Sequence, residues 1–218
     1  MTTRQVLFTL IGLTVGLLLV SAALFERLPE QLPSHWNIHG QIDGWTPRLA
    51  AVLLAPGFVV IFGGLLLLLP RISPIRYQID GFRPTYNWVV VLVALLFTYI
   101  HLVTLLTGLN PAFPSGRVII AGIMFMLAAM GNVMGKVRRN FWMGIRTPWT
   151  LADDGVWDQT HRLAAWLMTG TGLVSGVGTL LGFPVEVAFG LFMAGVLAPV
   201  FYSLVLYKQK ERAGTLQP

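Results

Sequence analysis

The sequence lacks cysteine entirely and contains few charged residues. Without cysteine, neither a disulfide bond nor a thiolate metal site can form. Only 11% of the 218 residues are charged, whereas a soluble globular domain carries about a quarter. Hydrophobic residues make up 55% of the chain, and the mean hydropathy is +0.71. These values exclude a surface that faces water on all sides and predict a polytopic membrane protein.

Six apolar stretches are long enough, or nearly so, to cross a bilayer core of about 30 Å. Inside a bilayer the backbone must satisfy its own hydrogen bonds, so these stretches are expected to be helices. We therefore predict an all-α integral membrane protein with six transmembrane helices and no soluble domain. The expected spans are residues 6–24, 49–69, 88–106, 118–134, 163–183 and 185–207.

Basic residues are distributed unevenly between the loops. With the N-terminus inside, only Arg27, Arg48 and Arg117 of the fifteen Lys and Arg residues fall in outer loops. Because Lys and Arg favour the cytoplasmic side of a bilayer, this bias predicts that both termini are inside (N-in/C-in). The net charge of +6 then belongs to loops beside anionic lipid headgroups, and no direct contact with nucleic acid is expected.

Residues 140–161 form the longest polar interruption of the chain and are predicted to lie in the cytoplasm. Pro148 pushes the preceding residue out of the helical region, and Thr150 with Asp153 resembles a capping box. We therefore predict a turn and then a helix that runs along the membrane interface and continues into the fifth span. Such a helix carries Trp157 and His161 on one face.

Arg146 lies between aromatic residues near the membrane, where an unpaired guanidinium is costly. We expect it to reach lipid phosphates or one of the nearest carboxylates, Asp153 and Asp154. Alternatively, it forms a binding site for a partner or ligand together with Trp149 and the tryptophan–histidine face.

The outer loop between the first two spans holds His35, His39 and Asp43 at intervals of four residues. In a helix these side chains would share one face and could ligate zinc. Gly40 and Gly44 weaken a helix, and neither a fourth ligand nor a general base is evident. The preferred interpretation is a compact, hydrogen-bonded loop that Trp36 and Trp45 anchor at the level of the lipid headgroups, with no metal or other cofactor. A surface that contacts something arriving from outside is one alternative, and the three-residue zinc site is the other.

Three polar residues lie within the spans or at their edges: His101, Asn132 and Glu186. An ionisable residue inside the membrane is a functional candidate by default. The preferred interpretation of His101 is a neutral, hydrogen-bonded structural histidine. The functional hypothesis is that His101 in the third span and Glu186 at the outer start of the sixth approach each other at similar depth.

Pairs of glycines four residues apart occur in the fourth and fifth spans. Small residues at this spacing let two helices approach closely. Packing within the chain is the preferred interpretation, and a homo-oligomer is the alternative. The pairs are Gly131 with Gly135, Gly172 with Gly176, and Gly178 with Gly182.

Two motifs resemble a known family. The inner motif closely resembles the signature of the SdpI-type bacterial immunity proteins: Asn140-x-x-x-Gly144-x-Arg146-Thr147-Pro148-Trp149-Thr150-Leu151, followed by Trp157-x-x-Thr160-His161. The outer motif is similar to the amino-terminal domain of unknown function that often precedes that signature: Pro33-x-His35-Trp36-Asn37-x-x-Gly40-x-x-Asp43. His39 is not part of the pattern. The resemblance divides the chain into a two-span domain, residues 1–87, and a four-span SdpI-like domain, residues 88–218.

The resemblance implies a protein of the bacterial cell membrane that protects a cell against a secreted, membrane-active peptide toxin. In the best-known system of this type, the immunity protein also senses the toxin and holds a small cytoplasmic repressor at the membrane. The residues of both motifs are then expected to bind toxin or partner without catalysis. From the residues alone, a small transporter or exporter of a hydrophobic peptide or ion is the alternative, and an intramembrane metal-dependent hydrolase is a remote one.

Overall fold

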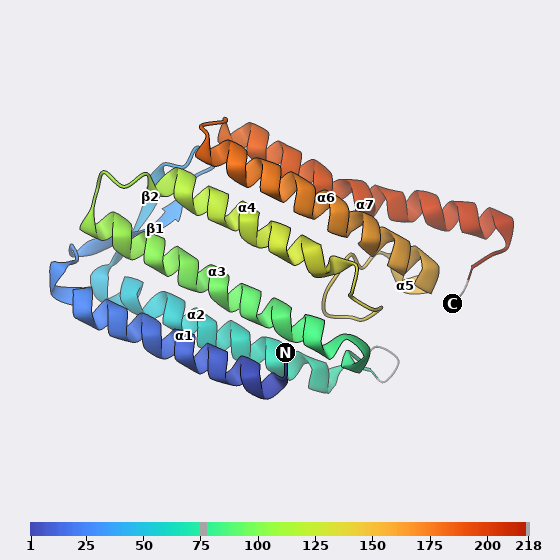
Figure 1. Ribbon diagram of the computed structural model, residues 1–218, viewed down its shortest axis with the longest axis horizontal. Helices are drawn as coiled ribbons and strands as arrows, with labels where there is room; N and C mark the ends of the chain where they lie inside the picture. The colour runs from blue at the N-terminus through green and yellow to red at the C-terminus, as the bar shows by residue number, and fades with distance from the viewer. Residues whose placement is uncertain (75–77, 217–218) are drawn as a thin grey trace.

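The computed structural model describes residues 1–74 and 78–216. Within these residues six helices are long and apolar enough to cross a membrane, which confirms the predicted all-α membrane fold. They are α1 (Thr3–Leu24), α2 (Arg48–Leu68), α3 (Arg83–Leu109), α4 (Ser115–Met134), α6 (Asp154–Leu180) and α7 (Val185–Ala213). The other elements are the short helix α5 (Pro148–Ala152), the 3-10 turns η1 (Phe25–Arg27), η2 (Leu69–Ile72) and η4 (Asp80–Phe82), and the strands β1 (Gln31–Trp36) and β2 (Ile42–Pro47) (Figure 1). Arg76, one of the basic residues assigned to the inner side, lies outside the described residues.

The long helices form two groups of three that lie side by side (Figure 1). Helices α1, α2 and α3 pack against one another, α4, α6 and α7 form the second group, and α3 packs on α4. Both termini lie toward one end of the bundle, here called the terminal end, and the two strands lie at the other, the hairpin end. An even number of crossings accounts for this arrangement. Which end faces the cytoplasm stays a prediction.

The flanks of the bundle are apolar and exposed. Leu19, Ile61 and Phe201 on three different helices are 65%, 61% and 67% exposed. Soluble proteins rarely expose large contiguous apolar patches. These flanks are therefore the surface that lipid chains contact.

Glycines in α4 and α6 allow these two helices to approach closely. A Cβ on Gly172 would lie 2.9 Å from the Cβ of Ala128, and one on Gly131 would lie 2.7 Å from the Cβ of Met168. Packing without side chains at these positions is the arrangement that small residues permit in membrane helices. Two of the glycine pairs thus contribute to packing within the chain, as the preferred interpretation predicted.

The outer loop is a two-stranded antiparallel hairpin, which the sequence did not predict. Strand β1 pairs with β2, and Asn37 closes the turn by accepting the backbone N–H groups of His39 and Gln41 at 2.9 and 3.0 Å. Gly40 in the turn has a φ of 75°, a left-handed conformation that favours glycine. The helix that the zinc alternative required is therefore not formed.

The hairpin packs on the second group of helices as well as on the first. The indole Nε1 of Trp36 donates to Ser115 Oγ at the start of α4, at 3.1 Å, and Gly40 lies directly against Gly116. Nδ1 of His39 lies 2.5 Å from Oε1 of Glu186 at the start of α7. The hairpin thus connects the two helix groups at one end of the bundle.

A side chain at position 116 should push the hairpin away from α4. We expect Gly116→Ala to lower the thermal unfolding midpoint of the detergent-purified protein, because its Cβ would overlap the backbone of Gly40 and such overpacking costs about 1–3 kcal/mol. Gly12→Ala is the matched control, since a Cβ there meets nothing within 4 Å. An unchanged midpoint for Gly116→Ala would show that the hairpin does not depend on this contact.

Candidate functional site

Asn140 organises the turn that follows α4 at the terminal end. Its side chain is fully buried and makes four hydrogen bonds to the backbone. Oδ1 accepts the N–H groups of Trp142 and Met143 at 2.7 and 2.9 Å, and Nδ2 donates to the carbonyls of Arg138 and Met143 at 2.8 and 3.1 Å. An aspartate or alanine could not supply both donor and acceptor. The first residue of the inner motif therefore determines the shape of the loop.

His161 fastens the same loop to α6. Ile145 donates its N–H to His161 Nε2 at 2.9 Å, so the proton of the neutral ring is on Nδ1, which donates to the carbonyl of Trp157 at 2.8 Å. The two rings are stacked with centroids 4.0 Å apart, and both side chains are buried. Gly144 has a φ of 106°, and a Cβ there would overlap the His161 ring. The predicted tryptophan–histidine face exists, but it points into the protein.

The helix start in this loop lies one turn earlier than the sequence suggested. The capping box is formed by Thr147 and Thr150 around α5, with the Thr150 N–H donating to Thr147 Oγ1 at 3.2 Å. Asp153 instead caps α6, accepting the N–H of Val156 at 2.7 Å. Helix α6 then runs without a break from Asp154 through the apolar part of the fifth span, which confirms the predicted continuation of a helix into that span (Figure 1). That its first turns run along the membrane interface stays a prediction.

Two basic residues outside the inner motif pair with Asp153 and Asp154. Lys210 Nζ, near the end of α7, lies 2.7 Å from Oδ1 of the buried Asp153. Arg139 Nε lies 2.8 Å from Asp154 Oδ1. The sequence indicated Arg146 as the nearest partner, because adjacency along the chain was the only available guide. The low exposure of the Arg139 side chain, 11%, shows that this residue belongs to the fold as well as to the basic surface.

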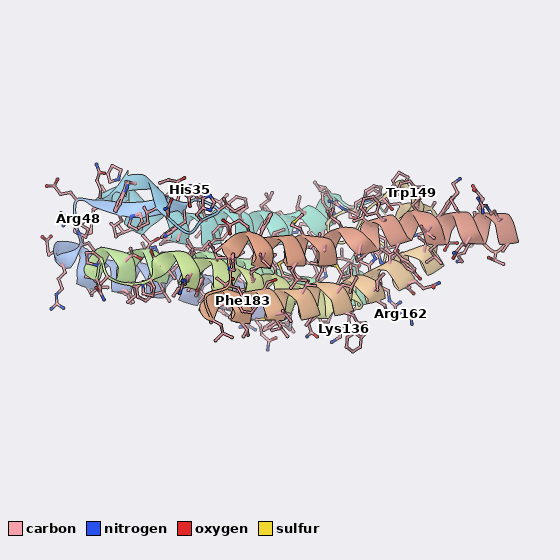
Figure 2. The ribbon with its side chains drawn as sticks, turned by 90° about the horizontal axis from the view of Figure 1, so that it is seen from above. His35, Arg48, Lys136, Trp149, Arg162 and Phe183 are labelled. Atoms are coloured by element: carbon pink, nitrogen blue, oxygen red, sulfur yellow. The ribbon has the colours of Figure 1, made fainter. Side chains whose placement is uncertain are left out.

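The inner motif leaves few of its side chains accessible. Arg146 is exposed and donates to the carbonyl of Phe141, while Pro148 is also exposed and Trp149 is half-buried. Figure 2 shows Trp149 on the opposite side of the bundle from Lys136 and Arg162. Thr160 is fully buried, and its Oγ1 has no hydrogen-bond partner among the described residues. A contact surface on this loop would therefore centre on Arg146 and its exposed neighbours.

The predicted contact between His101 and Glu186 is not formed. His101 Nε2 is hydrogen-bonded to Ser21 Oγ at 2.7 Å, and both groups are buried between α1 and α3. Glu186 pairs with His39 of the hairpin, so the expected approach of His101 to Glu186 was wrong. Asn132 is exposed on α4. The contact between Ser21 and His101 could not be predicted from the sequence, because the two residues are 80 positions apart.

The hairpin residues form two separate polar pairs. His35 Nδ1 lies 2.5 Å from Asp43 Oδ1 on the neighbouring strand. His39 Nδ1 instead lies 2.5 Å from Glu186 Oε1 at the start of α7. Figure 2 shows both His35 and Arg48 toward the hairpin end, with Arg48 nearer the tip of the molecule. In residues 1–74 and 78–216, no group of three or more His, Asp or Glu side chains is placed to hold a metal ion. The three side chains of the zinc alternative do not converge.

Apolar flanks, with hydrogen-bonded polar structure concentrated at both ends, define a multi-pass integral membrane protein. Residues 136–207 match the SdpI/YfhL protein family, and residues 12–60 match the Domain of unknown function (DUF1648). The chain is 26% identical over 159 residues to the Immunity protein SdpI of Bacillus subtilis (strain 168), which covers 73% of this chain and 74% of that protein. No solved structure matches the chain. The chain thus contains an SdpI/YfhL family region and a DUF1648 region, is similar to an SdpI-type immunity protein over most of its length, and is a multi-pass protein of the bacterial cell membrane.

Loss of the Asn140 side chain should destabilise the terminal-end loop. We expect Asn140→Ala to reduce stability by roughly 2–3 kcal/mol, because buried backbone donors lose their acceptor. Arg146→Ala is the control from the same loop and should change stability by less than about 0.5 kcal/mol, as an exposed residue does. Thermal unfolding of the detergent-purified variants measures both, and equal effects would contradict the structural role of Asn140.

Proposed function

We propose that this chain is a membrane immunity protein that protects a bacterial cell against a secreted, membrane-active peptide toxin. The observation that carries the proposal is the similarity to the Immunity protein SdpI, which extends over 73% of the chain. The two family matches, to residues 12–60 and 136–207, include the hairpin and the terminal-end loop. The inner motif organises the terminal-end loop, and the outer motif lies in the hairpin. The proposal assigns no catalytic step to the protein.

The proposed orientation exposes the hairpin to the outside of the cell. Lys136 and Arg138 follow the end of α4, Arg162 lies near the start of α6, and Lys208 lies near the end of α7. Positive charge favours the cytoplasmic side. A toxin arriving from outside would then meet the hairpin and the adjoining turns first. The basic terminal end would contact anionic lipid headgroups from the inside.

Toxin sensing is a further part of the proposal, with a small cytoplasmic repressor as the partner. Arg146, Phe141 and Pro148 form an exposed group on the terminal-end loop, held in place by buried neighbours. A guanidinium beside apolar side chains suits a protein contact, because arginine and aromatic residues are enriched at interfaces. We also propose the division into residues 1–87 and 88–218, whose interface includes the hairpin contacts.

Immunity can be tested in a Bacillus subtilis strain that lacks SdpI and is exposed to the toxin against which SdpI gives immunity. We expect expression of this chain to restore survival, because the two proteins share the family signature and most of their length. A vector without the gene and the native SdpI gene are the two controls. Membrane-inserted protein that gives no gain in survival would contradict the proposal.

The orientation can be tested by labelling single cysteines, since the natural chain has none. We expect a membrane-impermeant maleimide to label Ile38→Cys in intact cells, because Ile38 at the hairpin tip is 51% exposed. Phe141→Cys at the terminal end is 38% exposed and should react only after the membrane is permeabilised. The reverse pattern would place the hairpin inside the cell.

A further inference from the structure

A cavity of about 590 Å³ lies at the hairpin end, where three segments far apart in the sequence meet. Its lining comes from the hairpin tip, from residues 113–117 at the start of α4, and from residues 182–186 between α6 and α7. Small-ligand sites typically have volumes of about 300–1,000 Å³. Only Gly40 of the lining belongs to either family motif, so the motifs gave no indication of this site.

Arg117 is an exposed cation in the lining of this cavity. Within residues 1–74 and 78–216, no hydrogen bond or ion pair engages its guanidinium. The group lies against the α6–α7 turn, since a Cβ on Gly182 would be 3.7 Å from Arg117 Nη1. The other two arginines of the predicted outer loops differ from it. Arg48 donates to two backbone carbonyls at 3.0 Å. Arg27 is exposed, as Arg117 is, but it does not line the cavity.

The surroundings of Arg117 favour an anionic group. Arg117 lies in the first turn of α4, where the helix dipole adds partial positive charge. The carboxylate in the lining, Glu186, is already engaged by His39 at 2.5 Å. An incoming carboxylate would therefore find the guanidinium available, and arginine binds carboxylates through two parallel hydrogen bonds.

The remaining lining fits a peptide. Phe113, Phe183 and Ile42 provide apolar surface in the same cavity as the guanidinium. An amphipathic peptide offers a carboxylate and apolar side chains within a few residues, so both parts can be accommodated together. The paired His39 and Glu186 also provide polar atoms for the backbone of such a peptide.

We propose that this cavity binds a carboxylate of the secreted peptide toxin, with Arg117 as its ionic partner. The carboxylate is the C-terminus of the peptide or an acidic side chain. This inference rests on the proposed immunity function and adds a location and a chemistry to it.

The test is a binding cycle with the full chain in nanodiscs of phosphatidylcholine. The probe is the toxin peptide used in the survival assay, labelled with a fluorophore, with its carboxyl groups either free or methyl-esterified. We expect Arg117→Gln and esterification each to raise the Kd about tenfold, as for loss of one charge-assisted pair. Because both changes remove the same interaction, their combination should raise the Kd no further than either alone.

Arg27→Gln is the matched control, an exposed arginine of the same predicted outer side that does not line the cavity, and should bind the free peptide as the natural chain does. If the natural chain protects cells and binds the peptide, but Arg117→Gln binds equally well, this inference is wrong and the immunity function stands. If Arg117→Gln raises the Kd equally for the free and the esterified peptide, Arg117 binds lipid phosphate and not the peptide carboxylate. That result would also overturn this inference. If the natural chain neither protects nor binds, the immunity proposal fails, and this inference fails with it.

Discussion

The absence of water inside a bilayer is the constraint on which this structure depends. Each backbone N–H and C=O group in the hydrocarbon region needs a partner within the protein, and only helices or closed barrels provide one. The part of the chain that the structure describes meets this requirement with six long helices, and its irregular backbone lies at the two ends. Polar side chains within the spans follow the same requirement, as the bond between Ser21 and His101 shows.

The inner motif is chiefly a description of how the terminal-end loop folds. Asn140 satisfies backbone groups of the loop, Gly144 admits the His161 ring, and the Thr147–Thr150 pair begins α5. A motif that binds a partner directly would place its polar atoms at the surface. Here most of them are used internally, so the motif determines the position of the few exposed side chains around Arg146.

The helical part of the fold could be predicted from the sequence because apolar length and breaks at Pro, Gly and basic residues are local properties. The hairpin could not, since His35, His39 and Asp43 have a helical spacing, and only the pairing of two strands shows their true arrangement. Tertiary contacts were equally inaccessible: Glu186 meets His39 across 147 residues, and Asp153 meets Lys210 across 57. Of the candidate residues, the sequence placed Trp157 and His161 on one helix face, but it indicated neither that their rings stack nor that they are buried.

The hairpin has a consequence for how members of this family can be recombined. Its contacts pair position 36 with 115, 39 with 186, and 40 with 116, and in each pair one residue belongs to each of the two proposed domains. A chimera that takes its first two spans from one relative and the rest from another would bring together surfaces that were selected separately. An exchange of the halves therefore requires that both residues of each of these three pairs come from the same relative, although the two residues lie far apart in the sequence.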